Sequence, residues 1–150
     1  MTRQRTQGAS EVVLPCACAN LRRAARAVTQ LYDGELRAAG LRVTQFTLLQ
    51  VLAKAGPIRQ GQLGEILAMD STTLTRTLKL LVDEGWIRRA VGADRRQRYF
   101  ELTPTGRRQL QQATPSWERA QERLKKSLGE AGWRELEGVV VGVAGAARAG

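Results

Sequence analysis

The chain has 150 residues, enough for one domain that buries roughly two-thirds of its unfolded surface without disulfides or structural metals. Its 24 lysines and arginines outnumber 14 aspartates and glutamates, and the net charge of +10 favours a polyanionic partner, nucleic acid before an anionic membrane surface. Because the sequence contains no histidine, imidazole-based catalysis and histidine-bearing metal sites are excluded, and we expect neither an enzyme nor a cofactor or metal.

The N-terminal stretch, residues 1–13, is polar and aperiodic, so we expect a flexible tail. The start of the chain resembles a secretion signal only weakly, because its apolar part is short, contains Pro15 and leads directly into a charged helix. No apolar run approaches the roughly 18 residues that a membrane span requires. Two cysteines are too few for a disulfide framework, so the sequence predicts a cytoplasmic protein with no membrane partner.

Three helices are expected in the first half of the chain. Apolar residues at helical spacing predict a long amphipathic helix from Cys18 to about Leu36, which ends before Gly40. A second helix is predicted from an N-cap at Thr44 to about Ala55. Apolar residues cover more than half of its circumference, so we expect it to be the most buried helix. A short third helix follows a Gly-Pro break and, with the next helix, forms a helix-turn-helix.

Residues 69–103 combine a two-faced helix with a hairpin. The helix, capped by Asp70 or Ser71, has one apolar face and one polar face. The polar residues assigned to recognition are Ser71, Thr72, Thr73, Thr75, Arg76 and Lys79. The β-prone runs Trp86–Val91 and Arg98–Leu102 flank a basic turn and predict a hairpin. The predicted fold is therefore mainly α with a small β-hairpin wing, a winged helix-turn-helix lobe.

A long helical region is expected to begin at Thr103 and Pro104, a cap followed by proline at the first helical position. Apolar residues then step by three and four, Pro115 should kink or restart the helix, and a last helix should follow Gly129.

The terminal helices carry more apolar surface than one small winged domain needs to cover itself. We therefore interpret residues 14–40 and 104–146 as dimerisation helices and residues 43–103 as the DNA-binding lobe. A two-fold dimer would present two recognition helices to near-palindromic double-stranded DNA, with half-sites about one helical turn apart.

The chemistry of the polar helix face suits a major groove. Hydroxyl groups bond phosphates and base edges, and Arg76 can form a bidentate pair with guanine, although an ordinary solvated face would look the same. The hairpin favours recognition, because arginines at a tight turn can reach into a narrow minor groove. Its charged residues are Arg88, Arg89, Arg95, Arg96 and Arg98, with Asp94 expected to cap the turn or pair with an arginine.

The hairpin and the residues after it resemble a known family. Asp94-Arg95-Arg96, followed by Leu102-Thr103 and Gly106, is similar to the D-x-R…L-T-x-x-G signature of the MarR (multiple antibiotic resistance regulator) family. Residues 80–87 resemble that family's recognition-helix ending, and the similarity extends over residues 21–143.

This resemblance implies a two-fold dimer of winged lobes on an interlocked helical base. It also implies that Arg96 enters the minor groove and that Asp94 braces the wing. The activity implied is ligand- or stress-responsive transcriptional control, most often repression. Family members bind small phenolic or lipophilic compounds between base and lobes, or sense oxidants through cysteine.

Two further groups of residues have alternative interpretations. Cys16 and Cys18 are either packed at the dimer base or a sensor whose paired thiols are oxidised or take a soft metal. Tyr32, Trp117 and Trp133 either line a cavity for a small aromatic or lipophilic effector or belong to the core and interface.

The function predicted from sequence is a homodimeric DNA-binding transcriptional regulator. We expect a repressor that binds a pseudo-palindromic operator and is released by a small ligand or by thiol oxidation. The alternative is a winged helix used as a protein- or RNA-interaction module, since fold does not fix function. A thiol enzyme is a remote third class, because no nucleophile motif accompanies the cysteines.

Overall fold

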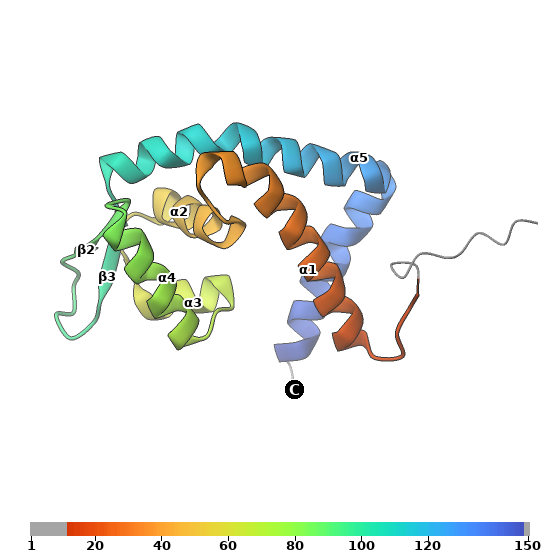
Figure 1. Cartoon of the computed structure of the whole chain (residues 1–150). Coiled ribbons are helices and arrows are strands. Elements are labelled where there is room, and N and C mark those ends of the chain that lie inside the picture. The colour runs from red at the N-terminus through yellow and green to blue at the C-terminus, as the bar shows by residue number, and fades with distance from the viewer. Residues whose placement is uncertain (1–11, 149–150) are drawn as a thin grey trace, which may run out of the picture.

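The computed structural model describes residues 12–148, and the expected tail, residues 1–13, lies outside the described residues except for its last two. The elements in chain order are α1 (Ala17–Leu36), η2 (Arg37–Ala39), α2 (Val43–Ala55), β1 (Ile58–Arg59), α3 (Gln60–Leu67), α4 (Ser71–Asp83), β2 (Ile87–Ala90), β3 (Tyr99–Leu102) and α5 (Pro104–Arg148). Figure 1 shows α5 along the length of the molecule, with α3, α4 and the strands at one end. At the other end α1 packs against α5. The predicted fold, mainly helical with a small sheet, is confirmed.

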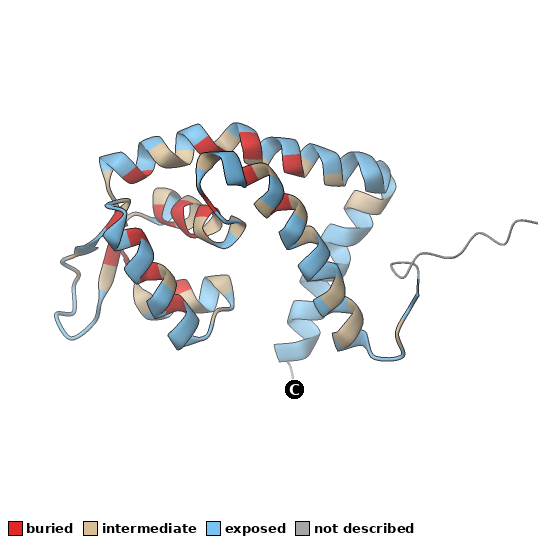
Figure 2. Cartoon of the chain, viewed as in Figure 1, coloured by how far each residue is buried: buried red, intermediate tan, exposed pale blue. Residues whose placement is uncertain are grey.

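The core is centred on α2, which was expected to be the most buried helix. Phe46, Leu48, Leu49 and Leu52 are buried, and Figure 2 shows the buried positions concentrated where α2, α4, the sheet and α5 face one another. Trp117 of α5 stacks on Phe46 with ring centroids 5.7 Å apart. The first part of α5 therefore covers the core of its own chain.

The predicted cap of α2 is wrong by two residues. The helix begins at Val43, so Thr44 lies inside its first turn. The first backbone donors are satisfied by other side chains: Asp33 of α1 accepts from the Val43 N–H at 2.8 Å, and Gln45 accepts from the Arg42 N–H at 2.9 Å. A carboxylate supplied by another helix left no signal in the local sequence.

The sheet has one more strand than the predicted hairpin. Its order is β1-β3-β2, with both pairs antiparallel, and Ile58 of β1 lies opposite Phe100 of β3. The two hairpin strands are each shorter than the β-prone runs that predicted them. β1 was missed because two residues are too few to show an alternating pattern.

Of the predictions for α5, the break at Gly129 is confirmed and a restart at Pro115 is wrong. Gly129 has φ 72° and ψ 169°, and the helix breaks there as expected. Pro115 does not restart the helix, because Gly129 is the sole non-helical position described within α5. Proline has no N–H, so the carbonyl four residues before Pro115 loses its helical partner, but Pro115 is exposed and water can solvate that carbonyl. The buried residues Ala113 and Ser116 keep this part of the helix packed on the core.

No helix within residues 12–148 is both long enough and apolar enough to cross a membrane.

An ion-pair cluster joins α1 to α5. Glu35 accepts from Arg123 Nη1 at 2.5 Å and from Arg119 Nε at 3.3 Å. The hydrogen bond from Arg123 and then that from Arg119 hold the pKa of the Glu35 carboxyl below its ordinary value.

The lowered pKa of Glu35 predicts a pH-dependent stability. Between the lowered pKa and the ordinary carboxyl pKa, Glu35 binds a proton in the unfolded chain but not in the folded chain. The contribution of Glu35 to the free energy of unfolding is therefore complete at neutral pH and is lost as the pH falls through the lowered pKa. We expect the melting temperature of Glu35→Gln to lie below wild type at pH 7 and the gap to close on acidification. Glu118→Gln, which removes an exposed α5 carboxylate that forms no ion pair within the described chain, is the charge-matched control. A gap that is constant with pH would contradict the prediction.

Candidate nucleic-acid interface

The start of α4 is fixed by Asp70, one of the two predicted caps. Asp70 Oδ1 accepts from the Thr73 N–H at 2.9 Å, and its Oδ2 accepts from the Thr73 hydroxyl at 2.6 Å. The Thr73 hydroxyl bond and then the Thr73 backbone bond lower the pKa of the Asp70 carboxyl. Asp70 therefore satisfies the helix N-terminus as an ionised cap. Thr73, predicted to contact DNA, uses its hydroxyl in this cap.

The two faces of α4 differ as the sequence predicted. Leu74, Leu78 and Leu81 are buried. The remaining residues predicted for recognition line a single shallow depression on the opposite face: Ser71, Thr72, Thr75, Arg76 and Lys79. Lys79 Nζ lies 2.6 Å from Asp83 Oδ2, but both side chains are more than half exposed, and such surface pairs stabilise little. The ammonium group can thus exchange its partner for a phosphate at small cost.

One contact to this face was not predicted. Gln60, the first residue of α3, donates from Nε2 to Thr75 Oγ1 at 3.0 Å. The two residues are 15 positions apart in the chain, and no local periodicity relates them. The packing of α3 against α4 is what brings them together.

The turn of the wing is built by Asp94. Its Oδ1 accepts from the Arg96 N–H at 2.9 Å, and its carbonyl accepts from the Gln97 N–H at 3.1 Å. Of the two roles foreseen for Asp94, this is the capping of the turn; within the described residues Asp94 forms no ion pair with an arginine. The carboxylate therefore fixes the backbone at the tip and leaves the guanidinium groups there uncommitted.

The arginines of the hairpin divide into two kinds. Arg88 Nε pairs with Glu101 Oε1 across the strands at 2.6 Å. The other four, Arg89, Arg95, Arg96 and Arg98, are exposed and form no ion pair within residues 12–148. Four of the five predicted charges thus remain unpaired, and three of them lie at the tip and its edge.

The wing tip and the recognition helix share a cavity. A space of about 520 Å³ opens between α3, the start of α4 and the hairpin, and both Ser71 and Arg96 line it, together with Arg98. The structure therefore brings two predicted groups, from opposite ends of residues 71–98, onto one continuous surface.

The base of the wing is held by the residues that carry the family resemblance. Thr103 Oγ1 contacts the carbonyls of Gly85 at 2.6 Å and Trp86 at 3.1 Å, and it accepts from the Gly106 N–H at 3.0 Å. A Cβ on Gly106 would lie 1.9 Å from the Trp86 carbonyl oxygen. Gly85, at φ 71°, ends α4 in the left-handed region that glycine accepts. The threonine and both glycines thus fix the angle between α4, the wing and α5.

The two cysteines lie at the start of α1. Both thiols are free and exposed within the chain. They line a cavity of about 540 Å³ that also contains Arg22, Arg23 and Arg26. The structure therefore places three arginines on the same surface as the thiols.

The three aromatic residues predicted as a ligand pocket lie in different settings. Trp117 packs on the core through Phe46. Tyr32 is buried and bonds Gln121 of α5, and burial raises the pKa of its phenol. Trp133, beyond the break at Gly129, bonds Glu137 one turn on at 2.8 Å. Within residues 12–148, none of the three aromatics lines the cavity beside the cysteines, the one between α1 and α2 or the one beside the wing tip, and Trp117 has the core role that was the alternative.

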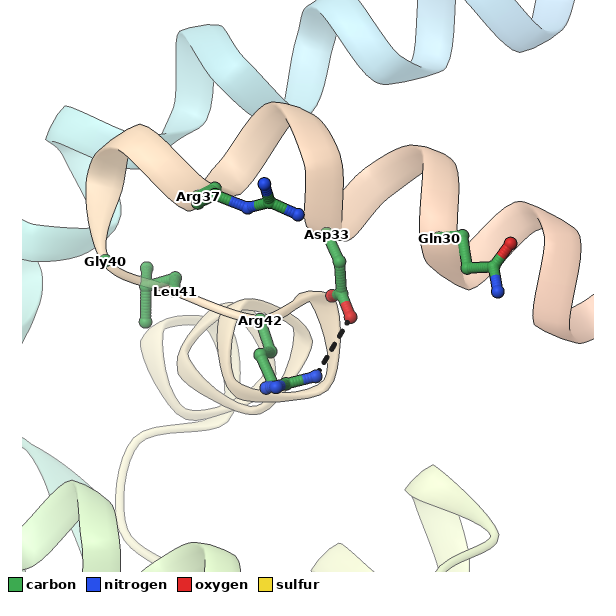
Figure 3. Close-up of a pocket in the computed structure, with 6 residues that line it drawn as sticks. All are labelled: Gln30, Asp33, Arg37, Gly40, Leu41 and Arg42. Atoms are coloured by element: carbon green, nitrogen blue, oxygen red, sulfur yellow. Dashed lines mark ion pairs between the residues drawn. The ribbon is translucent and has the colours of Figure 1, made fainter.

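Figure 3 shows a further cavity, which the sequence did not indicate, where the end of α1 meets the start of α2. It has a volume of about 450 Å³, and Gln30, Asp33, Arg37 and Arg42 line it. Arg42 Nη1 pairs with Asp33 Oδ2 at 3.5 Å, the dashed line in the figure. Its charged and amide side chains differ from the aromatic lining expected of an effector site.

Comparison with known proteins finds transcription regulators that are similar to this chain in sequence and fold. The model of the MarR family matches residues 39–97. The M. tuberculosis transcriptional regulator MosR, in a crystal structure in complex with DNA, is 37% identical, with a TM-score of 0.80, and the match covers 89% of this chain and 97% of that one. This chain belongs to the MarR family. The resemblance read from the wing and the residues after it is confirmed.

Two other transcriptional regulators extend the comparison. A probable transcriptional regulator from Pseudomonas aeruginosa is 26% identical, with a TM-score of 0.78, over 86% of this chain and 97% of that one. The uncharacterized HTH-type transcriptional regulator YwoH of Bacillus subtilis is 27% identical over 104 residues, which are 69% of this chain and 76% of YwoH. In this MarR-family protein the matched region contains α2, α3, α4, β2 and the turn of the wing, while β3, Thr103 and Gly106 follow it.

Proposed function

We propose that this protein is a homodimeric transcriptional regulator that represses by binding a pseudo-palindromic DNA operator. The observation that carries the proposal is the shared surface of the recognition helix and the wing, where Ser71 and Arg96 line one cavity. The α4 face would read base edges in the major groove, and Arg96 would enter the adjacent minor groove. MosR, which is 37% identical over nearly its whole length, has been crystallised in complex with DNA, and that supports the same partner here.

The dimer is proposed from the apolar surface of the last part of α5. Leu136, Val139, Val140, Val141 and Val143 are all exposed in the single chain. A row of exposed valines costs free energy in water unless a second surface covers it, and a second copy of the chain supplies a matching one. We therefore retain residues 14–40 and 104–146 as the dimerisation helices and 43–103 as the DNA-binding lobe, with the first part of α5 also covering the chain's own core.

The proposal is tested by one binding experiment. Purified protein is footprinted on the duplex that flanks its own coding region, and its oligomeric state is measured by sedimentation. We expect a symmetric footprint whose half-sites are about one helical turn apart, bound by a dimer. Competition with structured RNA distinguishes an operator-binding regulator from the alternative, an RNA-interaction module. Equal affinity for RNA and for duplex DNA would contradict an operator-binding role. A monomer, or a featureless footprint, would do so as well.

Release by thiol oxidation is proposed from the exposed pair Cys16 and Cys18 beside three arginines. A peroxide takes two electrons from one thiolate, which becomes a sulfenic acid as water or alcohol leaves. The second thiol, in the same or the partner subunit, then attacks that sulfur, water departs and a disulfide remains. The new bond would change the start of α1 and, through it, the spacing of the lobes.

We expect peroxide to lower the operator affinity of the wild type and a reducing thiol to restore it. The double variant with Cys16→Ser and Cys18→Ser should bind the operator equally with and without peroxide. Thiol titration shows that oxidation is complete. An unchanged affinity in the fully oxidised wild type would leave a small-ligand effector as the remaining means of release.

A further inference from the structure

Gln60 lies where the recognition helix, α3 and the wing meet. Its backbone N–H donates to the Arg98 carbonyl, next to β3, at 2.9 Å. Its side chain donates to Thr75 Oγ1 on α4 at 3.0 Å. One half-buried residue therefore connects the wing to the base-reading face.

Gln60 lies between two cavities. It lines the cavity of about 520 Å³ between α3, the start of α4 and the wing tip, and also a second one of about 350 Å³ between α4 and the sheet. Arg98 lines the same two cavities. Gln60 and Arg98 thus lie between the two cavities, and the backbone bond that joins these two residues fixes the main chain of Gln60 beside α4.

Thr75 differs from three other threonines in the helices. Thr47, Thr77 and Thr114 each donate their hydroxyl proton to the carbonyl four residues earlier, at 2.8 to 2.9 Å. Thr75 forms no such bond to Ser71 within the described chain, and its side chain is exposed. A hydroxyl has one proton to donate and two lone pairs to accept with. Because Gln60 fills one of the two lone pairs, half of the accepting capacity of Thr75 is used inside the protein, while its proton forms no bond within the described residues.

We propose that Gln60 is a positioning residue that makes Thr75 a hydrogen-bond donor to DNA. In the major groove a donor is matched by the acceptor edges of guanine O6 and thymine O4, and it is mismatched by the amino edges of cytosine N4 and adenine N6. At the base pair that faces Thr75, the protein therefore favours an acceptor edge over an amino edge. The inference rests on the proposed function, because Thr75 must face DNA.

The test reverses the polarity of the bond. In Gln60→Glu the carboxylate can only accept, so it draws the Thr75 proton inward and leaves lone pairs facing the groove. Gln62→Glu is the charge-matched control: it adds the same charge to α3, two residues on, where the side chain contacts Arg59 instead of Thr75. Thr75→Val removes the hydroxyl with little change of shape. Each protein is used, full length, to select duplexes from a library randomised across the wild-type footprint.

We expect wild type and Gln62→Glu to enrich acceptor edges over amino edges about five-fold at one position in each half-site, the ratio that a single hydrogen bond of about 1 kcal/mol gives. Gln60→Glu should reverse this preference, and Thr75→Val should abolish it. The added charge lowers the affinity of both Glu variants, but base preference is a ratio that a general loss does not alter. Should Gln60→Glu fold poorly, Gln60→Ala frees the hydroxyl to donate or accept, and the preference should flatten.

Two results overturn the inference. One is a Gln60→Glu or Gln60→Ala protein that selects the same base pairs as wild type. The other is a Thr75→Val protein that keeps the wild-type preference. A wild type that enriches no duplex at all would instead refute the proposed function, and the inference would fall with it.

Discussion

Gly106→Ala is expected to destabilise the fold by about 3 kcal/mol, which is roughly a 10 °C loss in melting temperature for a chain of this size. The added Cβ would lie 1.9 Å from the Trp86 carbonyl oxygen and 2.7 Å from its carbon. That carbonyl accepts from the Thr103 N–H at 3.0 Å, so moving it away breaks the bond between the wing base and the start of α5. Overpacking and the loss of a partly buried hydrogen bond therefore act together.

The control is Gly61→Ala in α3. Gly61 is also helical, but nothing lies within 4 Å of its added Cβ. Alanine there should stabilise slightly, by up to about 1 kcal/mol, because glycine is the poorer helix former. Both variants are melted beside wild type at one protein concentration, since the stability of a dimer depends on concentration. Equal melting temperatures for Gly106→Ala and wild type would contradict the prediction, because they would show that the wing base adjusts to the added Cβ with no loss of stability.

Arg96→Ala is expected to weaken operator binding about 30-fold. Each dimer would lose two wing arginines, and at about 1 kcal/mol each this gives a loss of about 2 kcal/mol. The loss should be similar for all duplex sequences, and the salt dependence should flatten, because a charge near the phosphates is removed. Stability should not change, because Arg96 is exposed and forms no ion pair within residues 12–148.

Matched variants separate the role of Arg96 from that of charge alone. Arg88→Ala removes the same charge from the wing, but Arg88 already pairs with Glu101 at 2.6 Å, so a smaller loss is expected. Arg76→Ala, on α4, should mainly relax the choice of sequence and not lower affinity uniformly. The measurement is fluorescence anisotropy of a labelled operator over a salt series. Arg96→Ala binding as tightly as wild type would remove the wing from the mechanism.

Several features of the site were predictable because they are local. The polar face of α4 follows from helical periodicity, and the cap by Asp70 involves residues three positions apart. The turn built by Asp94 joins its carboxylate to a backbone N–H two residues on. Such contacts depend on backbone geometry that a few neighbouring residues determine. The family signature then indicated which wing arginine, Arg96, is expected to enter the minor groove.

The sequence by itself determined the class of fold, the order of helices and hairpin, the break at Gly129 and the surface that carries the positive charge. Only the tertiary structure decided which distant groups meet: Gln60 with Thr75, Gly106 with the Trp86 carbonyl, and Trp117 with the core instead of a ligand cavity. Periodicity tells which face of an element is apolar, but not the height or angle at which two elements pack. Those are fixed when all side chains fill the core together.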